Sequence, residues 1–87
     1  MNFNNHVKIG TVVSKHGYKG NLKINVSSLS VDTLQDLKHI FIHIDDCFIP
    51  FMIDDIKLFS KNMLVVKLKE INSEKEVGEI IHKNIYV

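Results

Sequence analysis

The stretch that decides the fold is VKIGTVVSKHGYKGNLKINV, residues 7–26. Its first part, Val7 to Ser14, is rich in β-branched residues, and its last part, Asn21 to Val26, alternates polar and apolar residues without a break. Both patterns are typical of strands, and the alternation indicates that one side of the second strand is buried. The stretch therefore predicts a β-hairpin whose connection runs from Lys15 to Gly20.

The connection holds two glycines, Gly17 and Gly20, three positions apart. Glycine accepts a positive φ and a close backbone approach, so this spacing predicts a tight, shaped turn. The same segment offers ammonium groups, an imidazole and a phenol, and another lysine follows on the second strand. We therefore expect the turn to be a contact surface as well, formed by Lys15, His16, Gly17, Tyr18, Lys19, Gly20 and Lys23.

Length and composition are those of a small globular domain. A chain of 87 residues buries a little over ~60% of the surface that its unfolded form exposes, enough for one core. With 45% hydrophobic and 24% charged residues, it does not resemble a disordered tail. The single cysteine, Cys47, and the absence of a long apolar run or a secretory N-terminus predict a cytoplasmic protein without a membrane segment.

The charges limit the kind of nucleic-acid contact that the chain can make. The net charge is only +1, so binding to nucleic acid requires a local basic patch. All 11 basic residues are lysine, and without arginine the chain lacks the bidentate fork that reads guanine edges. Contact with phosphates is therefore open, whereas sequence-specific readout is disfavoured.

Further strands follow the hairpin. They are predicted at Lys38–Ile44, Cys47 to about Lys57, Met63–Leu68 and Ile85–Val87, with a tight turn at Asp45-Asp46. Pro50 lacks a backbone N–H, so it should lie at an edge, a bulge or a barrel corner. Before these strands, the polar residues Ser30, Asp32 and Thr33 suggest a short helical turn or an irregular loop.

A single helix is predicted near the C-terminus. Ser73 and Glu76 match a capping box, in which the hydroxyl and the carboxylate each satisfy a backbone N–H at a helix start. Apolar residues at helical spacing follow, so the helix should run from Glu74 to about Ile81. Five or six short strands with one helix predict a mainly β domain, and an antiparallel barrel would remove the exposed edges of an open sheet.

The sequence predicts neither an enzyme nor a cofactor site. His39 and His43 on one strand would lie about 13 Å apart, too far to share a metal ion. The adjacent carboxylates of Asp45-Asp46 and of Asp54-Asp55 would point to opposite faces of extended chain. Cys47 is better explained by packing than by thiolate chemistry, and no nucleophile, base and orienting group occur together.

The segment Gly17–Gly20 is similar to the G-x-x-G loop by which KH domains clamp single-stranded nucleic acid. KH domains place that loop between two helices, whereas both flanks here are predicted strands, which disfavours a KH domain. A plain hairpin whose lysines are only solvated is the remaining alternative.

The run from Ile9 to Ile24 resembles the opening signature of the N-terminal domain of the RimM family of ribosome maturation factors. In that signature a strand glycine precedes a His-Gly-apolar-basic-Gly bend and a strand with an alternating basic residue. The segments Phe48–Ile53, Leu64–Leu68 and Ile85–Val87 are similar to later parts of the family, so the resemblance covers nearly the whole chain. The signature places are filled by Gly10, His16, Gly17, Tyr18, Lys19, Gly20 and Lys23.

This chain also departs from the family pattern. Lys15 stands where proline is common, Asn21 where an acidic residue is frequent and Lys19 where arginine is usual. In the late helix, Glu74 replaces a frequent arginine, and His82 follows where glycine is common. These changes concern the details of contact more than the family resemblance.

The resemblance implies a six-stranded antiparallel β-barrel of the translation-protein type over residues 1–87, and a second, PRC-type barrel that is absent from this chain. It implies a non-catalytic role in small (30S) subunit assembly and rRNA processing near the subunit head. The implied partners are the immature small subunit with its head rRNA, and ribosomal protein S-nineteen, bound mainly through the second barrel. The protein itself is expected to be a monomer.

Two hypotheses about the contact surface follow. In the first, Lys15, Lys19 and Lys23 contact rRNA phosphates, while His16 and Tyr18 supply hydrogen bonds or stacking. In the second, an interaction module docks a ribosomal protein or the second barrel without direct RNA contact. Its docking surface would be an exposed strand edge or the face formed by His39, Phe41 and His43.

Overall fold

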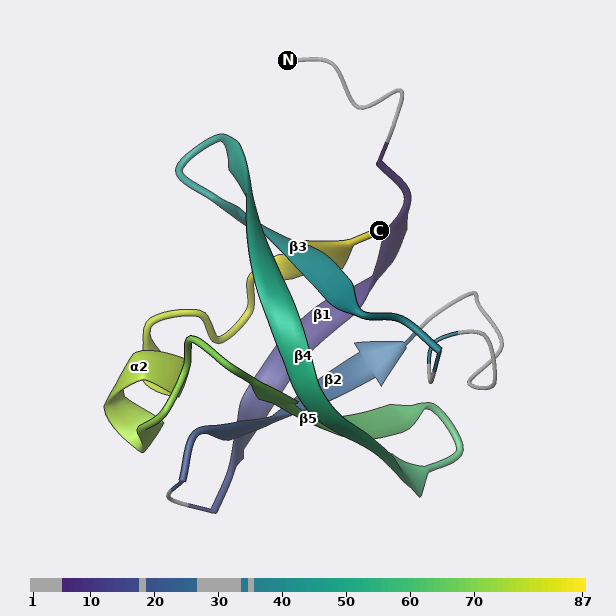
Figure 1. The fold of residues 1–87 in the computed structure, drawn as a ribbon, viewed down its shortest axis with the longest axis vertical. Helices are drawn as coiled ribbons and strands as arrows, with labels where there is room; N and C mark the ends of the chain where they lie inside the picture. Colours follow the sequence, from purple (N-terminus) through teal and green to yellow (C-terminus); the bar gives the residue numbers. More distant parts are fainter. Residues whose placement is uncertain (1–5, 18, 27–33, 35) are drawn as a thin grey trace.

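A closed antiparallel barrel forms the domain in the computed structural model, which describes residues 6–17, 19–26, 34 and 36–87 (Figure 1). Around the barrel the strands follow the order β1-β2-β5-β4-β3-β6. The described elements are β1 (Lys8–His16), β2 (Asn21–Val26), β3 (His39–Ile44), β4 (Cys47–Ser60), β5 (Met63–Leu68), α2 (Glu74–Gly78) and β6 (Asn84–Tyr86). This arrangement confirms the prediction of a six-stranded barrel with one short helix near the C-terminus.

The alternation in the sequence becomes the inner and outer surfaces of the barrel. Along β2 and β5, every second side chain is buried, as predicted from the period of two. The core also includes Leu34, which precedes β3, and Val77 of α2. Burial of these aliphatic side chains is the main stabilising contribution to such a small domain.

β4 is a bent strand that serves two neighbours in turn. Its first half, from Cys47 to Met52, pairs with β3, and its second half, from Ile53 to Ser60, pairs with β5. Pro50 lies in the first half, opposite Phe41, in a part of β4 that pairs on one side only. The missing N–H of Pro50 therefore removes no ladder bond on the second side, in agreement with the predicted edge position.

Several predicted boundaries are wrong. β1 extends through Lys15 to His16, because both residues pair with the start of β2, so the connection is shorter than predicted. The long strand continues beyond Lys57 because its second half pairs with β5. The helix ends at Gly78 and not near Ile81, since glycine is a poor helix former.

Two local predictions at the β3–β4 turn have different outcomes. Asp45 and Asp46 both have positive φ, 50° and 64°, which is the conformation of a two-residue type I′ hairpin turn and confirms the tight turn. Cys47 is exposed, so the packing role predicted for it is wrong. It lies directly after that turn, where it pairs with Ile44 at the far end of the hairpin. The predicted helical turn at residues 30–33 lies outside the described residues.

Candidate nucleic-acid interface

The turn between β1 and β2 places the predicted contact residues at one end of the barrel. The pairs Lys15–Leu22 and His16–Asn21 are the last before the turn. Gly17 and Gly20 both have positive φ, 76° and 92°, a conformation that other residues rarely adopt. Tyr18 lies outside the described residues.

The two glycines have different surroundings. A Cβ at Gly17 would meet no atom within 4 Å, whereas a Cβ at Gly20 would lie 2.6 Å from the carbonyl oxygen of Ile71 and 2.8 Å from the Cα of Asn72. Lys67 holds that neighbouring segment in place, since its Nζ donates to the carbonyl oxygen of Ile71 and to Asn72 Oδ1 at 3.0 Å. The Gly20 end of the turn is therefore packed against the segment before α2.

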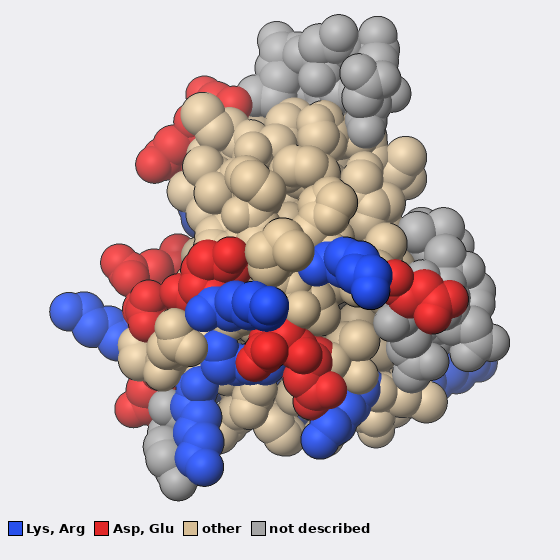
Figure 2. All heavy atoms as spheres, in the orientation of Figure 1, with Lys and Arg blue, Asp and Glu red and all other residues tan. Residues whose placement is uncertain are grey.

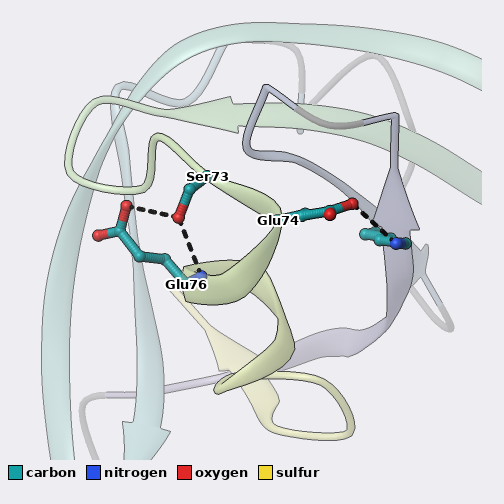
Figure 3. Close-up of polar contacts among 4 residues, drawn as sticks. Ser73, Glu74 and Glu76 are labelled. Carbon is teal, nitrogen blue, oxygen red and sulfur yellow. Dashed lines mark hydrogen bonds and ion pairs between the residues drawn. The ribbon is translucent and has the colours of Figure 1, made fainter.

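The start of α2 is fixed by its own cap. Ser73 Oγ accepts from the N–H of Glu76 at 3.2 Å, as the capping box predicts, while the Glu76 carboxylate accepts from the N–H of Asn72 at 3.1 Å. In Figure 3 Glu74 points from α2 to the neighbouring strand β1, where it forms an ion pair of 2.8 Å with Lys15 Nζ. This pair joins the first turn of α2 to the last residues of β1.

Lys23 and His16 both contact an aromatic ring that the sequence did not indicate. Lys23 Nζ lies 4.2 Å from the centroid of the Phe59 ring, and the His16 imidazole lies edge-on to the same ring at 5.6 Å. Phe59 comes from the second half of β4, far from the turn in sequence, and half of it is exposed. Pairing of β1 with β2, of β2 with β5 and of β5 with β4 brings the three strands into one part of the sheet.

We call Lys15, His16, Lys19 and Lys23 the basic end of the barrel. Lys19 is exposed in the turn, and Lys15 is exposed at the end of β1. The hairpin places these residues at the same end of the barrel as Gly17 and Gly20. Lys15 contacts Glu74 of α2, whereas Lys23 and His16 contact Phe59 of β4. A capped helix start signals Glu74 in the sequence, but no sequence signal points to Phe59.

The second predicted surface is a cluster of rings. His39, Phe41 and His43 share one face of β3, where the Phe41 ring lies edge-on to His39 at 5.3 Å. Phe48 stacks on His6 at 4.1 Å and meets Tyr86 at 4.9 Å. We call this surface the aromatic–histidine face; it consists of His6, His39, Phe41, His43, Phe48 and Tyr86.

Charge separates these two surfaces. Figure 2 shows a largely uncharged surface over β3 and the first half of β4, whereas basic and acidic side chains interleave over the lower part of the view. Short-range apolar contact suits the aromatic–histidine face, and contact with phosphates suits the lysines of the basic end.

Metal sites and surface grooves are two other kinds of feature to compare with these surfaces across the described residues. Those residues contain no group of three or more His, Cys, Asp or Glu side chains able to hold a metal ion. A surface groove of about 270 Å³ along β1 is lined by Lys8, Gly10, Thr11, Val12, Val13, Asn25 and His82, which include neither a thiol nor a carboxylate. None of the helices in the described part of the chain could span a membrane.

Comparison with known proteins identifies one family. Residues 7–87 match the family described as RimM N-terminal domain. The ribosome maturation factor RimM of Parabacteroides distasonis is 30% identical over 81 residues, which cover 91% of this chain and 45% of that protein. The RimM of Azobacteroides pseudotrichonymphae is 24% identical over 87 residues, or 100% of this chain and 50% of that protein. The chain thus spans about half the length of the curated relatives that it matches.

Solved structures agree on the fold. The crystal structure of RimM from Pseudomonas aeruginosa superposes with a TM-score of 0.82 at 23% identity, covering 95% of this chain and 50% of that one. The solution structure of the N-terminal domain of RimM from Thermus thermophilus has a TM-score of 0.76 at 18% identity and covers 95% of this chain and 88% of that one.

Proposed function

Because this chain belongs to the RimM N-terminal domain family, we propose that it assists ribosome maturation by binding immature small (30S) subunits. Its relatives carry the name ribosome maturation factor. The proposed role is assembly of the subunit and processing of its rRNA, with binding near the subunit head. It is a binding role without catalysis, in a protein whose second, PRC-type barrel would bind ribosomal protein S-nineteen.

The basic end carries this proposal. Lys15, Lys19 and Lys23 come from β1, from the turn and from β2, and the hairpin places them at one end of the barrel. The hairpin is held at Gly20 by the segment before α2. Lys23 pairs in register with Ser14 and points to the outer face of the hairpin, whereas Lys15 pairs with the buried Leu22 and points to Glu74 of α2. The two ammonium groups therefore flank one end of the barrel, and charges spread around such an end suit a folded phosphate backbone.

The proposed contact reads shape and charge. A lysine ammonium is a compact point charge that binds phosphate without a bidentate fork. Lys15 already pairs with Glu74, so contact with a phosphate exchanges an intramolecular partner for an intermolecular one. Because this ion pair is exposed to solvent, the exchange requires little free energy, about 0–1 kcal/mol.

A second candidate function rests on the aromatic–histidine face. An uncharged face of packed rings suits a protein partner, which would be S-nineteen or the second barrel. On this alternative, Phe41→Asp lowers association with small subunits by about tenfold or more, because a carboxylate replaces a ring in an apolar contact. The salt dependence of the remaining association would be unchanged.

Salt-dependent association tests the RNA role. The variant Lys15→Ala/Lys19→Ala/Lys23→Ala and a control, Lys8→Ala/Lys38→Ala/Lys69→Ala, remove the same charge from different exposed sites. We expect the first variant to bind immature small subunits more weakly and to flatten the plot of log affinity against log salt by about 2 slope units, at ~0.7–0.9 per phosphate contact. The control should retain the wild-type slope. Equal slopes for the two variants contradict the RNA role.

A further inference from the structure

Phe59 is an exposed aromatic residue without a structural role in the core. It is 52% exposed, whereas Phe51 on the same strand is 8% exposed and belongs to the core. A ring of this size is normally buried, because its transfer from water is strongly favourable. The exposed part of the Phe59 ring is therefore accessible to a ligand, and its neighbours decide which kind of ligand it suits.

The backbone directs this ring outward. The register between β4 and β5 shifts between Leu58, which pairs with Leu64, and Ser60, which pairs with Met63. Phe59 thus lies in a β-bulge, a device that re-aims a side chain near the end of a strand pair. Lys23 Nζ of β2 lies over one face of the ring, and His16 of β1 meets the ring in a T-shaped contact, so three strands contribute to one small surface.

The chemistry of this surface fits a base of single-stranded nucleic acid. Proteins that bind single strands combine aromatic rings, on which bases stack, with cations that track the phosphates. Phe59 supplies an exposed ring, Lys23 supplies an ammonium group 4.2 Å from its centroid, and His16 supplies a second planar group. Lys23 and His16 also belong to the basic end, so a nucleic-acid strand that contacts its lysines would reach the ring.

We propose that Phe59, flanked by Lys23 and His16, is a stacking site for an unpaired nucleobase of the bound RNA. The inference rests on the proposed function, since it assumes that the basic end contacts RNA. It names a narrower class of ligand than the proposed function does. The site would bind unpaired bases in loops, bulges or single strands, because the bases of a regular duplex are stacked on each other. Phe59 provides the stacking surface through the ring face that Lys23 does not cover, and Lys23 contacts the adjoining phosphate.

Phe59→Leu tests the stacking site, because it keeps an apolar side chain and removes the π-face. Binding of the protein to single-stranded oligo-uridine and oligo-adenosine and to a blunt RNA duplex is measured at one low salt concentration. We expect Phe59→Leu to weaken single-strand binding by about 5- to 150-fold, the range for loss of one stacked base. Duplex binding should stay within about twofold. Leu58→Ala, at the similarly exposed neighbouring position, should bind both RNAs like the wild type.

A second variant reports stacking directly. The chain contains no tryptophan, so Phe59→Trp introduces a unique fluorophore that keeps an aromatic face. We expect single-stranded RNA to quench its fluorescence and the duplex to leave it unchanged. This measurement remains informative even if Phe59→Leu disturbs the fold.

Three results overturn the stacking site. These are wild-type single-strand affinity for Phe59→Leu, an equal loss for single strand and duplex, or loss of binding to isolated small-subunit proteins with RNA binding intact, which would make Phe59 a protein contact. If the triple lysine variant flattens the plot of log affinity against log salt while Phe59→Leu binds single-stranded RNA like the wild type, only the stacking site is contradicted. If the lysine variant also retains its slope, the proposed function fails as well.

Discussion

The basic end and the aromatic–histidine face are built in opposite ways on one barrel. At the basic end, long exposed side chains stand on a backbone that is shaped by glycine and supported by the segment before α2. At the aromatic–histidine face, the shape comes from rings that pack on one another. These rings belong to β3, β4 and β6 and to His6, which precedes β1. Substitutions of the glycines at the basic end should therefore change the shape of the backbone, and substitutions of its lysines should change binding through charge. Substitutions at the aromatic–histidine face should change stability through packing.

The largest expected effect is at Gly20. Gly20→Ala forces a Cβ into positive φ and to within 2.6 Å of the Ile71 carbonyl oxygen, so we expect a loss of about 3 kcal/mol in the free energy of unfolding. Gly17→Ala also meets positive φ but has open space around it, and it should lose about 1 kcal/mol. Denaturant unfolding of both variants measures the difference between their free energies of unfolding. Equal losses would mean that contact with the segment before α2 does not hold the turn.

An intermediate effect is expected at Phe48. Phe48→Ala removes a ring that contacts His6, His43 and Tyr86. We expect a loss of about 2 kcal/mol in the free energy of unfolding, since each aromatic pair adds ~0.5–1.5 kcal/mol beyond its burial and this ring is only half-buried. Denaturant unfolding measures the loss, and titration with RNA at two salt concentrations should give the wild-type slope. A flattened slope would show that the two surfaces are not independent.

The smallest effect is expected at the exposed ion pair. Glu74→Gln keeps the shape of the side chain and removes its charge, so the free energy of unfolding should change by less than about 0.5 kcal/mol. Because Lys15 loses a competing partner, association with RNA at low salt should strengthen by about twofold. Glu79→Gln, another exposed residue just after α2, controls for the general effect of removing one negative charge. Weaker binding by Glu74→Gln would mean that the pair positions Lys15 productively.

Local patterns predicted much of the fold, because period-two alternation directly reports burial in β2 and β5. The sequence also predicted that Pro50 lies at an edge, a bulge or a barrel corner, since a missing N–H has a purely local consequence. The length of β4 was underestimated because its second half is stabilised by pairing with β5, a partner later in the chain. Helix length was overestimated because apolar spacing outweighed Gly78 in the prediction.

The candidate site was predictable in part for the same reason. Lys15, His16, Lys19 and Lys23 lie within one hairpin, so their proximity follows from the turn. Phe59 joins them only through the pairing of β5 with both β2 and β4 and through a register shift, neither of which leaves a local sequence pattern. The pairing of Lys15 with Glu74 is likewise a product of the tertiary fold.

Crosslinking tests the central claim, that the basic end faces RNA, most directly. A photo-reactive amino acid is placed at Lys19 in one variant and at His39 in another, and each protein is bound to immature small subunits and irradiated. We predict that the probe at Lys19 crosslinks to rRNA and that the probe at His39 does not. Crosslinks to rRNA from His39, with only protein crosslinks or none from Lys19, would contradict the proposed orientation of the domain on the ribosome.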